Sequence, residues 1–381
     1  MKLRMVIAGI LLLFIIHAGI DCTRMVPDNV TRIIEEVRNE YAPDSRIAVY
    51  NVDASFENDS LTLAGEILSP DAKASLIGKI EALDKYDIND RITLLPHPDI
   101  GAENHGLIKL STAQVRRSPE IESEMITQGS MGMRIRVLKY TGKGRRSWWR
   151  YCQLEDGYLG WIMRSAMVTG DQNFIDTWNR QAKLIVSANY SNVREDAAEK
   201  SPIVSDLVFS NKIVNLGRMS GWYHVELPDG RTGYVKADDV IEEIEWLSQP
   251  PAEAKDVVET ASHFMGIPYL WGGTSVKGFD CSGFTQSVFK FNRILLPRDA
   301  NMQVHSGENV PLENGLDLLQ PGDLLFWGPN ADRITHVGIY IGESEFIHAD
   351  GMVHINSFDP ENEKYSEYRR RTLRVARRVL Q

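Results

Sequence analysis

The sequence predicts a multidomain protein with a small α+β domain at its N-terminus, two small β-barrels in the middle and an α+β domain at its C-terminus. Three observations support this prediction. The chain has 381 residues, more than a single hydrophobic core ordinarily serves. A stretch of about 60 residues occurs twice in its middle, as expected of tandem copies of one small domain. Its C-terminal part begins with helical patterns and continues with strand-like segments, the order of an α+β fold.

The composition and the charge limit the classes of function. Hydrophobic residues make up 43% of the chain and charged residues 25%, the proportions of a folded, soluble protein. The formal net charge of −10 argues against a nucleic-acid partner, because phosphate contacts need a basic surface. Two local basic clusters, 145–150 and 369–378, are expected to be solvated strand or loop faces.

Residues 1–22 have the pattern of a secretory signal peptide. A basic start precedes an apolar run from Met5 to Ile16 that is short for a membrane span, and cleavage after Ala18 would suit a small-residue site. We therefore expect an exported protein, periplasmic or at the cell surface. Cys22 could accept a lipid, so a membrane association is expected only if the protein is a lipoprotein.

Residues 28–98 are predicted to form a small α+β accessory domain. Apolar periodicity over 30–37 predicts a helix, and IAVYNV and LTLAGEIL predict two strands. A second helix is expected from Ser69-Pro70-Asp71, where serine caps and proline suits the first turn, and RITLLP predicts a last strand. This α-β-β-α-β segment carries no chemical motif.

The repeated stretch predicts two barrels. WWRYCQLEDGYLGWI at 148–162 aligns with GWYHVELPDGRTGYV at 221–235 when the chain is shifted by 73 residues, so that Trp149 matches Trp222. Short alternating segments broken by Gly, Asp and Asn are typical of small β-barrels. Both copies resemble bacterial SH3 (SH3b) domains. The predicted domains span 105–170 and 180–245.

The three cysteines, Cys22, Cys152 and Cys281, cannot all be paired with one another. Cys152 aligns with Val225 of the second copy, an inward strand position, which predicts a small core residue. A Cys152–Cys281 disulfide is the competing interpretation, and it would consume the best-placed nucleophile of the chain.

The last domain, predicted over 251–381, contains that nucleophile. AEAKDVVETASHFMG predicts a helix that stops at Gly266. FDCSGFTQSVFKF has apolar residues at helical spacing, so Cys281 is expected in the first turn of a second helix, with Asp280 or a neighbour as its cap. Unpaired N–H groups and the helix dipole stabilise a thiolate at such a position, and the thiolate is the attacking species.

Two histidines are predicted to lie beside the thiol. THVGIYIG and EFIHA predict strands around a turn-prone run, and His336 and His348 are each six residues from Gly342. A hairpin centred there makes the two histidines cross-strand neighbours on one face. A thiol, an imidazole and a second imidazole that orients the first follow the logic of a catalytic triad. The same side chains could instead bind zinc with one open position, or be unrelated to one another.

Five motifs occur in order over 251–381 and carry a resemblance to a known family. They are Y-L-W-G-G (269–273), F-D-C-S-G-F (279–284), L-P-R-D (296–299), P-G-D-L-L-F-W (321–327) and H-V-G-I-Y-I-G (336–342). Together they resemble the NlpC-type papain-like cell-wall endopeptidases. The resemblance implies a papain-like α+β fold in which Cys281 is the nucleophile, His336 the base and His348 the orienting residue.

The same resemblance implies further site residues. The Tyr269 hydroxyl would hold the oxyanion together with the backbone N–H of Cys281. Asp280, Ser282 and Trp271 match motif positions expected to contact the substrate. For Tyr269 the competing interpretation is an aromatic core residue between a helix and a loop.

The two SH3b domains ahead of this domain give a layout similar to the γ-D-glutamyl-L-diamino acid endopeptidases of murein-peptide recycling. That similarity implies that an acidic residue of the first barrel, Tyr158 and Asp299 hold the free amine of L-Ala. The acidic residue is assigned to Glu124, with Glu120 and Glu122 as alternatives. The R-D-A segment lacks the hydroxyl of the usual R-D-S.

The sequence therefore predicts a cysteine peptidase that cuts between γ-D-glutamate and an L-diamino acid, diaminopimelate or lysine, in murein stem peptides with a free N-terminal L-Ala. No metal and no other cofactor is expected, and the predicted partners are murein stem peptides or peptidoglycan. One alternative is a D,L-endopeptidase that acts on intact peptidoglycan. Another is a non-catalytic wall-binding protein with a relic site.

Overall fold

The computed structural model describes residues 25–380 except 58, 143, 145 and 314. The predicted signal peptide and Cys22 lie outside the described residues. The chain forms two compact units. Of the described residues, one unit holds those up to Tyr41 together with Tyr50–Thr93, and the other holds Ala42–Val49 together with those from Leu94 onward. None of the helices in the described part of the chain is long and apolar enough to cross a membrane.

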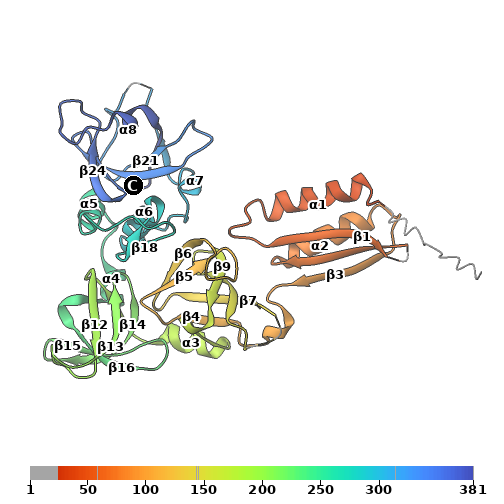
Figure 1. Ribbon diagram of the computed structural model, residues 1–381, viewed down its shortest axis with the longest axis horizontal. Helices are drawn as coiled ribbons and strands as arrows, with labels where there is room; N and C mark the ends of the chain where they lie inside the picture. Colours follow the sequence, from red (N-terminus) through yellow and green to blue (C-terminus); the bar gives the residue numbers. More distant parts are fainter. Residues whose placement is uncertain (1–24, 58, 143, 145, 314, 381) are drawn as a thin grey trace, which may run out of the picture. The chain divides into compact units, whose positions relative to one another are not determined.

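The first unit has the predicted α-β-β-α-β order. Its elements are α1 (Asp28–Tyr41), β1 (Tyr50–Glu57), β2 (Ser60–Ile67), α2 (Pro70–Glu81) and β3 (Ile88–Leu94). The strands form a sheet in the order β1-β2-β3, and α1 and α2 contact each other (Figure 1). Ser69 caps α2 as expected, because its hydroxyl accepts a hydrogen bond from the Ala72 N–H at 3.2 Å. The first strand begins only at Tyr50, so residues 47–49 of the expected strand IAVYNV lie outside it.

The two repeats form two seven-stranded barrels of the same topology. The first contains β4 (His105–Ile108), β5 (Thr112–Arg116), β6 (Met125–Ser130), β7 (Arg134–Tyr140), β8 (Trp149–Leu154), β9 (Leu159–Met163) and β10 (Met167–Gly170), with the short helices η1 (Pro98–Ile100) and η2 (Arg164–Ala166). The second contains β11 (Lys183–Val186), β12 (Tyr190–Arg194), β13 (Ile203–Val208), β14 (Lys212–Met219), β15 (Trp222–Glu226), β16 (Thr232–Lys236) and β17 (Val240–Glu242), with η3 (Ala237–Asp239). Helix α3 (Gln172–Arg180) lies between the barrels in the chain, and α4 (Glu243–Ser248) follows the second.

The strand orders show that the repeat is structural. They are β10-β4-β7-β8-β9-β5-β6 in the first barrel and β17-β11-β14-β15-β16-β12-β13 in the second, so each strand has its counterpart seven strands on. Cys152 faces Gly160 across β8 and β9, as Val225 faces Gly233 across β15 and β16. Cys152 is fully buried in the barrel core and free, as the repeat predicted, and Cys281 is free as well.

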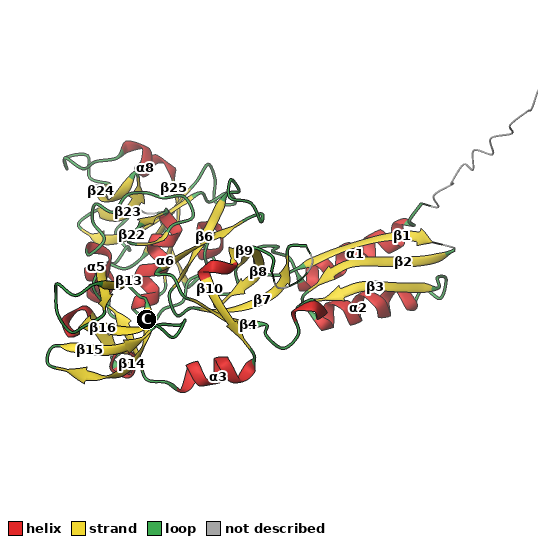
Figure 2. Cartoon of the chain, turned by 60° about the horizontal axis from the view of Figure 1, so that its bottom comes forward, coloured by secondary structure: helices red, strands yellow, loops and turns green. Residues whose placement is uncertain are grey.

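The C-terminal domain is an α+β fold with one six-stranded antiparallel sheet. Its elements are α5 (Ala254–Ser262), β18 (Thr274–Ser275), β19 (Gly278–Phe279), α6 (Cys281–Phe291), α7 (Ala300–Gln303), β20 (Glu308–Val310), β21 (Leu324–Trp327), β22 (His336–Gly342), β23 (Glu345–Asp350), β24 (Met352–Ser357), α8 (Glu367–Thr372) and β25 (Leu373–Arg378). The sheet order is β20-β25-β21-β22-β23-β24, and α6 packs on β22 and β23 (Figure 2). Phe284 and Val288 of α6 are fully buried in the core between helix and sheet, as the helical spacing predicted.

Two predicted boundaries in this domain were wrong. Helix α5 ends at Ser262, not at Gly266, and the chain then turns until Gly266 takes a left-handed φ of 80°. The expected last strand RTLRVARRV begins only at Leu373, because Thr372 still belongs to α8.

The first barrel packs closely on the segment that leads into α6. Gln128 of β6 accepts hydrogen bonds from the Thr274 N–H at 2.9 Å and from the Ser275 hydroxyl at 3.0 Å. Gly272 lies so near the barrel that a Cβ on it would be 2.3 Å from the Met125 carbonyl oxygen. A Cβ on Gly273 would likewise lie 2.2 Å from the Gly278 carbonyl oxygen. Close packing therefore explains why both of these positions in Y-L-W-G-G are glycine.

Candidate active site

Cys281 is the first residue of α6, where the sequence placed it. Asp280 is the N-cap, and its Oδ1 accepts a hydrogen bond from the Gly283 N–H at 2.6 Å. The thiol is 8% exposed and lies near the N–H of Val337, at the start of β22. The helix thus presents the sulfur to the strand that carries His336.

The two histidines form a hydrogen-bonded chain that ends on Asn356. His336 Nε2 and His348 Nδ1 are 2.9 Å apart, and His348 Nε2 lies 3.0 Å from Asn356 Oδ1. The Asn356 amide donates to the Lys364 carbonyl oxygen at 3.2 Å, so its own oxygen must accept the proton of His348 Nε2. His348 Nδ1 then accepts from His336 Nε2–H. His336 Nδ1 is then the ring nitrogen that is free to accept a proton. This is the tautomer that a base facing the thiol requires.

The predicted register of the histidines was wrong, although the prediction that they share a face is confirmed. The strands pair Ile339 with Ile347, so His348 lies opposite Gly338 and diagonal to His336. A bulge between Tyr340 and Gly342 causes the difference from a symmetric hairpin. Gly338 makes the room, because a Cβ there would be 2.9 Å from the Cβ of His348.

Burial opposes a charge on both the Cys281 thiol and the His336 imidazole. It raises the pKa of the Cys281 thiol to about 12, with Asp280 adding to the effect and the Val337 N–H opposing it. It lowers the pKa of His336 well below 6.5, with the nearby Arg369 and His348 adding to the effect. Burial therefore opposes the thiolate expected at the helix N-terminus, while the N–H groups of Val337 and Ser282 favour it.

Asp280 and Ser282, predicted to contact the substrate, belong to a buried network around Arg298. The Arg298 guanidinium donates to Asp280 Oδ1 and to the Ser282 hydroxyl, both at 3.0 Å, and its Nε donates to Thr127 Oγ1 of the first barrel at 2.8 Å. Asp280 also accepts from the Gly272 N–H at 2.9 Å. This network holds the start of α6 against the first barrel, while a substrate contact of Asp280 or Ser282 stays a prediction.

The structure brings the other predicted substrate residues together in two pairs. Tyr158 donates its hydroxyl proton to Asp299 Oδ2 at 2.9 Å, across the barrel and the catalytic domain. Trp271 donates its indole N–H to Glu124 Oε1 at 2.8 Å. Arg117 also bonds to Glu124 and lowers the pKa of its carboxyl. Of the three candidate glutamates, Glu124 is the one with a contact to the catalytic domain among the described hydrogen bonds.

Tyr269 lies near the thiol, as its predicted role requires. It is half-buried and packs against the core cluster that contains Cys281. Burial, with Cys281 and Asp280 nearby, raises the pKa of its hydroxyl, which therefore stays a proton donor at neutral pH. An oxyanion contact of this hydroxyl stays a prediction.

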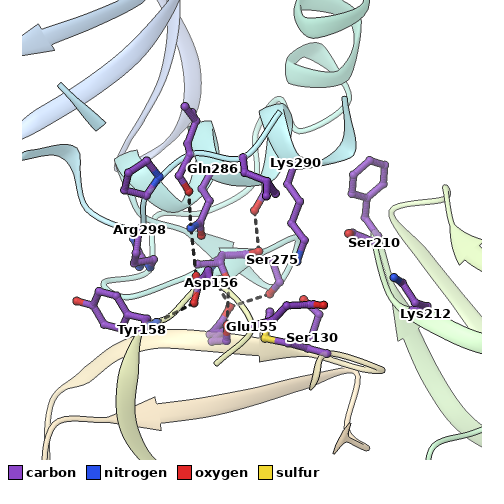
Figure 3. Close-up of a pocket in the computed structure, with 18 of the residues that line it drawn as sticks. Ser130, Glu155, Asp156, Tyr158, Ser210, Lys212, Ser275, Gln286, Lys290 and Arg298 are labelled. Carbon is purple, nitrogen blue, oxygen red and sulfur yellow. Dashed lines mark hydrogen bonds between the residues drawn. The ribbon is translucent and has the colours of Figure 1, made fainter. Parts of the chain in front are cut away.

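A separate cavity of about 800 Å³ lies between the barrels and the catalytic domain (Figure 3). Figure 3 shows Asp156 between Tyr158 and Gln286, with the Gln286 amide donating to Asp156 Oδ2 at 3.3 Å. Tyr158 and Arg298 line this cavity, but Cys281, His336 and His348 do not. We therefore assign the chemistry to the histidine chain and not to the cavity.

Three residues around the site were not predicted from the sequence: Asn356, Arg298 and Arg46. Asn356 had a signal, because it lies on the strand after EFIHA at the same parity as His348. Arg298 lies in the L-P-R-D motif, but the motif gives no sign of its burial. Arg46 bonds to Asp299 at a separation of 253 residues, which no local pattern indicates.

The described residues contain no cluster of three or more His, Cys, Asp or Glu side chains that could hold a metal ion. The candidate site therefore consists of the Cys281 thiol and the imidazoles of His336 and His348, which are hydrogen-bonded to each other at 2.9 Å. His336 can accept a proton from the sulfur, while Asn356 holds the ring of His348 and His348 holds the ring of His336. The site can therefore support nucleophilic acyl transfer.

Comparison with known proteins agrees with these observations. Residues 266–376 match the NlpC/P60 family, residues 115–167 the bacterial dipeptidyl-peptidase Sh3 domain and residues 189–241 the bacterial SH3 domain. The chain is 34% identical over 200 residues to a gamma-D-glutamyl-L-lysine dipeptidyl-peptidase of Bacillus cereus, an alignment that covers 51% of this chain and 57% of that protein. It is 40% identical over 123 residues to a probable endopeptidase of Haemophilus influenzae, covering 30% of this chain and 71% of that protein.

A solved structure supports the fold. The crystal structure of an NlpC/P60 family protein from Bacillus cereus superposes with a TM-score of 0.63 at 24% identity, covering 73% of this chain and all of that one. The chain spans about half the length of the first gamma-D-glutamyl-L-lysine dipeptidyl-peptidases it matches, 57% of the Bacillus cereus protein and 46% of one from Bacillus subtilis.

Proposed function

Because the chain belongs to the NlpC/P60 family, we propose that it is a cysteine peptidase that hydrolyses the bond between γ-D-glutamate and an L-diamino acid in murein stem peptides. The observation that carries this proposal is the series of hydrogen bonds from His336 through His348 to Asn356, beside Cys281. The names of the relatives in Bacillus cereus and Bacillus subtilis, gamma-D-glutamyl-L-lysine dipeptidyl-peptidases, support the bond and the substrate class.

In the proposed reaction the Cys281 sulfur attacks the γ-carbonyl carbon of D-glutamate while its proton moves to His336 Nδ1. The Tyr269 hydroxyl and the Cys281 N–H, which belongs to the first turn of α6 where N–H groups have no acceptor within the helix, hold the oxyanion. The C–N bond then breaks, and the amine of the diamino acid leaves with the proton from His336. Water hydrolyses the thioester, with His336 first taking and then returning a proton, and the γ-carboxylate is released.

The burial of Cys281 and His336 fits this sequence of steps, because burial favours the neutral form of each group. We propose that the ion pair forms as the proton moves during attack. His348 and Asn356 orient the ring of His336 and share the positive charge that it gains, as the orienting residues of triads do. No step uses a metal, and we propose that none is required.

Substrate selection is proposed to depend on the two acidic pairs. Tyr158 with Asp299, and Trp271 with Glu124, surround the position where the N-terminal L-Ala of a free stem peptide would lie. Carboxylates there suit a free ammonium group, which forms charge-assisted hydrogen bonds. The protein is proposed to act after export, at the cell surface or in the periplasm.

Replacement of the triad residues tests this proposal. Cys281→Ala should lower kcat by at least about a thousandfold, and His336→Ala should do nearly as much, because nucleophile and base act as one unit. His348→Ala should cost less, since only the orientation of His336 is lost. Hydrolysis of L-Ala-γ-D-Glu-diaminopimelate is the measurement, with circular dichroism as the control for folding. Cys152→Ala is the matched control and should keep full activity per folded molecule. A folded Cys281→Ala protein with normal turnover would refute the mechanism.

A further inference from the structure

The segment Ala42–Val49 joins α1 to β1 in the chain, yet it packs as part of the unit that contains the barrels and the catalytic domain. Its backbone is bound to the first barrel. The Leu159 N–H donates to the Arg46 carbonyl oxygen at 2.7 Å, and the Gln153 amide donates to the Ile47 carbonyl oxygen at 3.3 Å. Leu159 directly follows Tyr158, so the segment lies beside one of the acidic pairs described above.

The side chain of Arg46 occupies that pair. Its Nη1 donates to Asp299 Oδ2 at 2.6 Å, the same oxygen that accepts the Tyr158 hydroxyl, and to Asn301 Oδ1 at 2.8 Å. The rest of the guanidinium is held by Asp44, through Nε at 2.9 Å and Nη2 at 2.6 Å. Arg46 is 30% exposed, so a ligand can approach the group without unfolding the segment.

A cation is therefore already bound where the proposed function needs one. An ammonium group that bonded to Asp299 would have to replace Arg46 Nη1 as the donor to Oδ2 or share that oxygen with it. Two cations that share one oxygen lie close enough to repel each other. Displacement of the Arg46 side chain from Asp299 would leave the carboxylate of Asp299 with its full negative charge.

From this geometry we propose that Arg46 is a specificity-determining residue, an internal competitor that occupies Asp299 in place of the substrate's free amine. The proposal rests on the proposed function. With Arg46 bound, the charge of Asp299 is compensated and a free amine gains little over an acylated one. With Arg46 displaced, the pocket is acidic and selects free peptides. The segment Ala42–Val49 therefore sets how strongly the enzyme prefers free over N-acylated stem peptides.

Arg46→Ala tests the proposal with two substrates, L-Ala-γ-D-Glu-diaminopimelate and its N-acetylated form. The variant should raise kcat/KM for the free peptide by about tenfold, the worth of one charge-assisted contact, and the gain should lie in KM. The rate on the acetylated peptide should change by less than about twofold, because it brings no charge to Asp299. Arg46→Lys keeps a cation at the site and should stay near the wild type.

Arg231→Ala is the matched control. Arg231 takes the place of Tyr158 in the second barrel and pairs with Asp229 at 3.0 Å, as Arg46 pairs with Asp44, but it has no contact with the catalytic domain among the described bonds. Its kinetics should equal those of the wild type. Thermal unfolding of each variant shows whether it folds. If Arg46→Ala does not fold, Arg46→Gln provides the same comparison, since it removes the charge and keeps an amide donor for Asp299.

The outcomes separate this inference from the function on which it rests. A wild-type enzyme that cuts neither peptide overturns the proposed function and this inference with it. A wild-type enzyme that cuts the peptides, with an Arg46→Ala variant that changes both rates equally or neither, overturns the inference alone. A higher KM in Arg46→Ala for both peptides would also overturn it, because Arg46 would then bind a carboxylate of the substrate.

Discussion

At the scale of single residues, the site depends on proton positions that hydrogen bonds determine. Asn356 Oδ1 accepts a hydrogen bond from His348 Nε2–H, because the amide nitrogen of Asn356 already donates to the Lys364 carbonyl oxygen. The tautomer of each histidine ring follows from that bond. Arg298 has a comparable role for the nucleophile, since it binds both the helix cap Asp280 and Thr127 of the first barrel. Both residues act through others and do not touch the reacting atoms.

The buried base predicts the pH dependence of the reaction. His336 must be neutral to accept the thiol proton, and burial lowers its pKa well below 6.5. A lowered pKa keeps the imidazole neutral to a lower pH, so kcat/KM should hold from pH 7 to well below pH 6.5 before it falls. A pH–rate profile on the free tripeptide measures this, with thermal unfolding at each pH to show that the protein stays folded. An acid limb with its midpoint at or above 6.5 would contradict the effect of burial.

At the scale of elements, close contacts of glycine position the catalytic helix. Gly272 combines a left-handed φ of 73° with a virtual Cβ only 2.3 Å from the Met125 carbonyl oxygen. It therefore allows the segment before α6 to touch β6 of the first barrel. Gly266 has a similar φ of 80° but open space around it.

These two glycines make a matched pair for a stability test. Gly266→Ala should cost about 1 kcal/mol, the strain of a left-handed residue. Gly272→Ala should cost clearly more, because the barrel backbone must also move, and it should lower activity through the displaced Trp271 and Asp280. Denaturant unfolding and peptide hydrolysis measure the two effects. Equal losses of stability in both variants would mean that the contact with Met125 has no energetic weight.

Local patterns predicted the elements better than their registers. The apolar spacing of Phe284 and Val288 was enough to predict α6, and the alignment of Cys152 with Val225 was enough to place both inside a barrel. The diagonal placement of His336 and His348 was not predictable, since it depends on a bulge and on the left-handed φ of Glu343 and Ser344. Spacing along a strand does not reveal such irregularities.

The effect of burial on the thiol was not predictable from the sequence for a related reason. A helix N-terminus stabilises negative charge, and the N–H groups of Ser282 and Val337 do lower the pKa of Cys281. Burial is the larger effect, and it depends on what the sheet and the barrel place around the sulfur. Contacts between distant parts of the chain, such as Arg46 with Asp299, lie beyond local patterns in the same way.

At the scale of the whole molecule, the first barrel is part of the proposed substrate site. It supplies Tyr158 and Glu124 to the two acidic pairs, and Thr127 and Gln128 to the support of the catalytic helix. The described contacts of the second barrel with the catalytic domain lie away from the two acidic pairs. They include the ion pair of Asp206 with Lys277 at 2.7 Å and the packing of Phe209 on Phe264. The repeat thus produced two copies of one fold with different roles.

Mass spectrometry of the products that the purified protein forms from L-Ala-γ-D-Glu-diaminopimelate shows whether it is the proposed peptidase. We expect two products, L-Ala-γ-D-Glu and free diaminopimelate, with rates unchanged by EDTA and no products from Cys281→Ala. The intact tripeptide after long incubation, cleavage at the L-Ala bond, or activity that EDTA abolishes and zinc restores would contradict it.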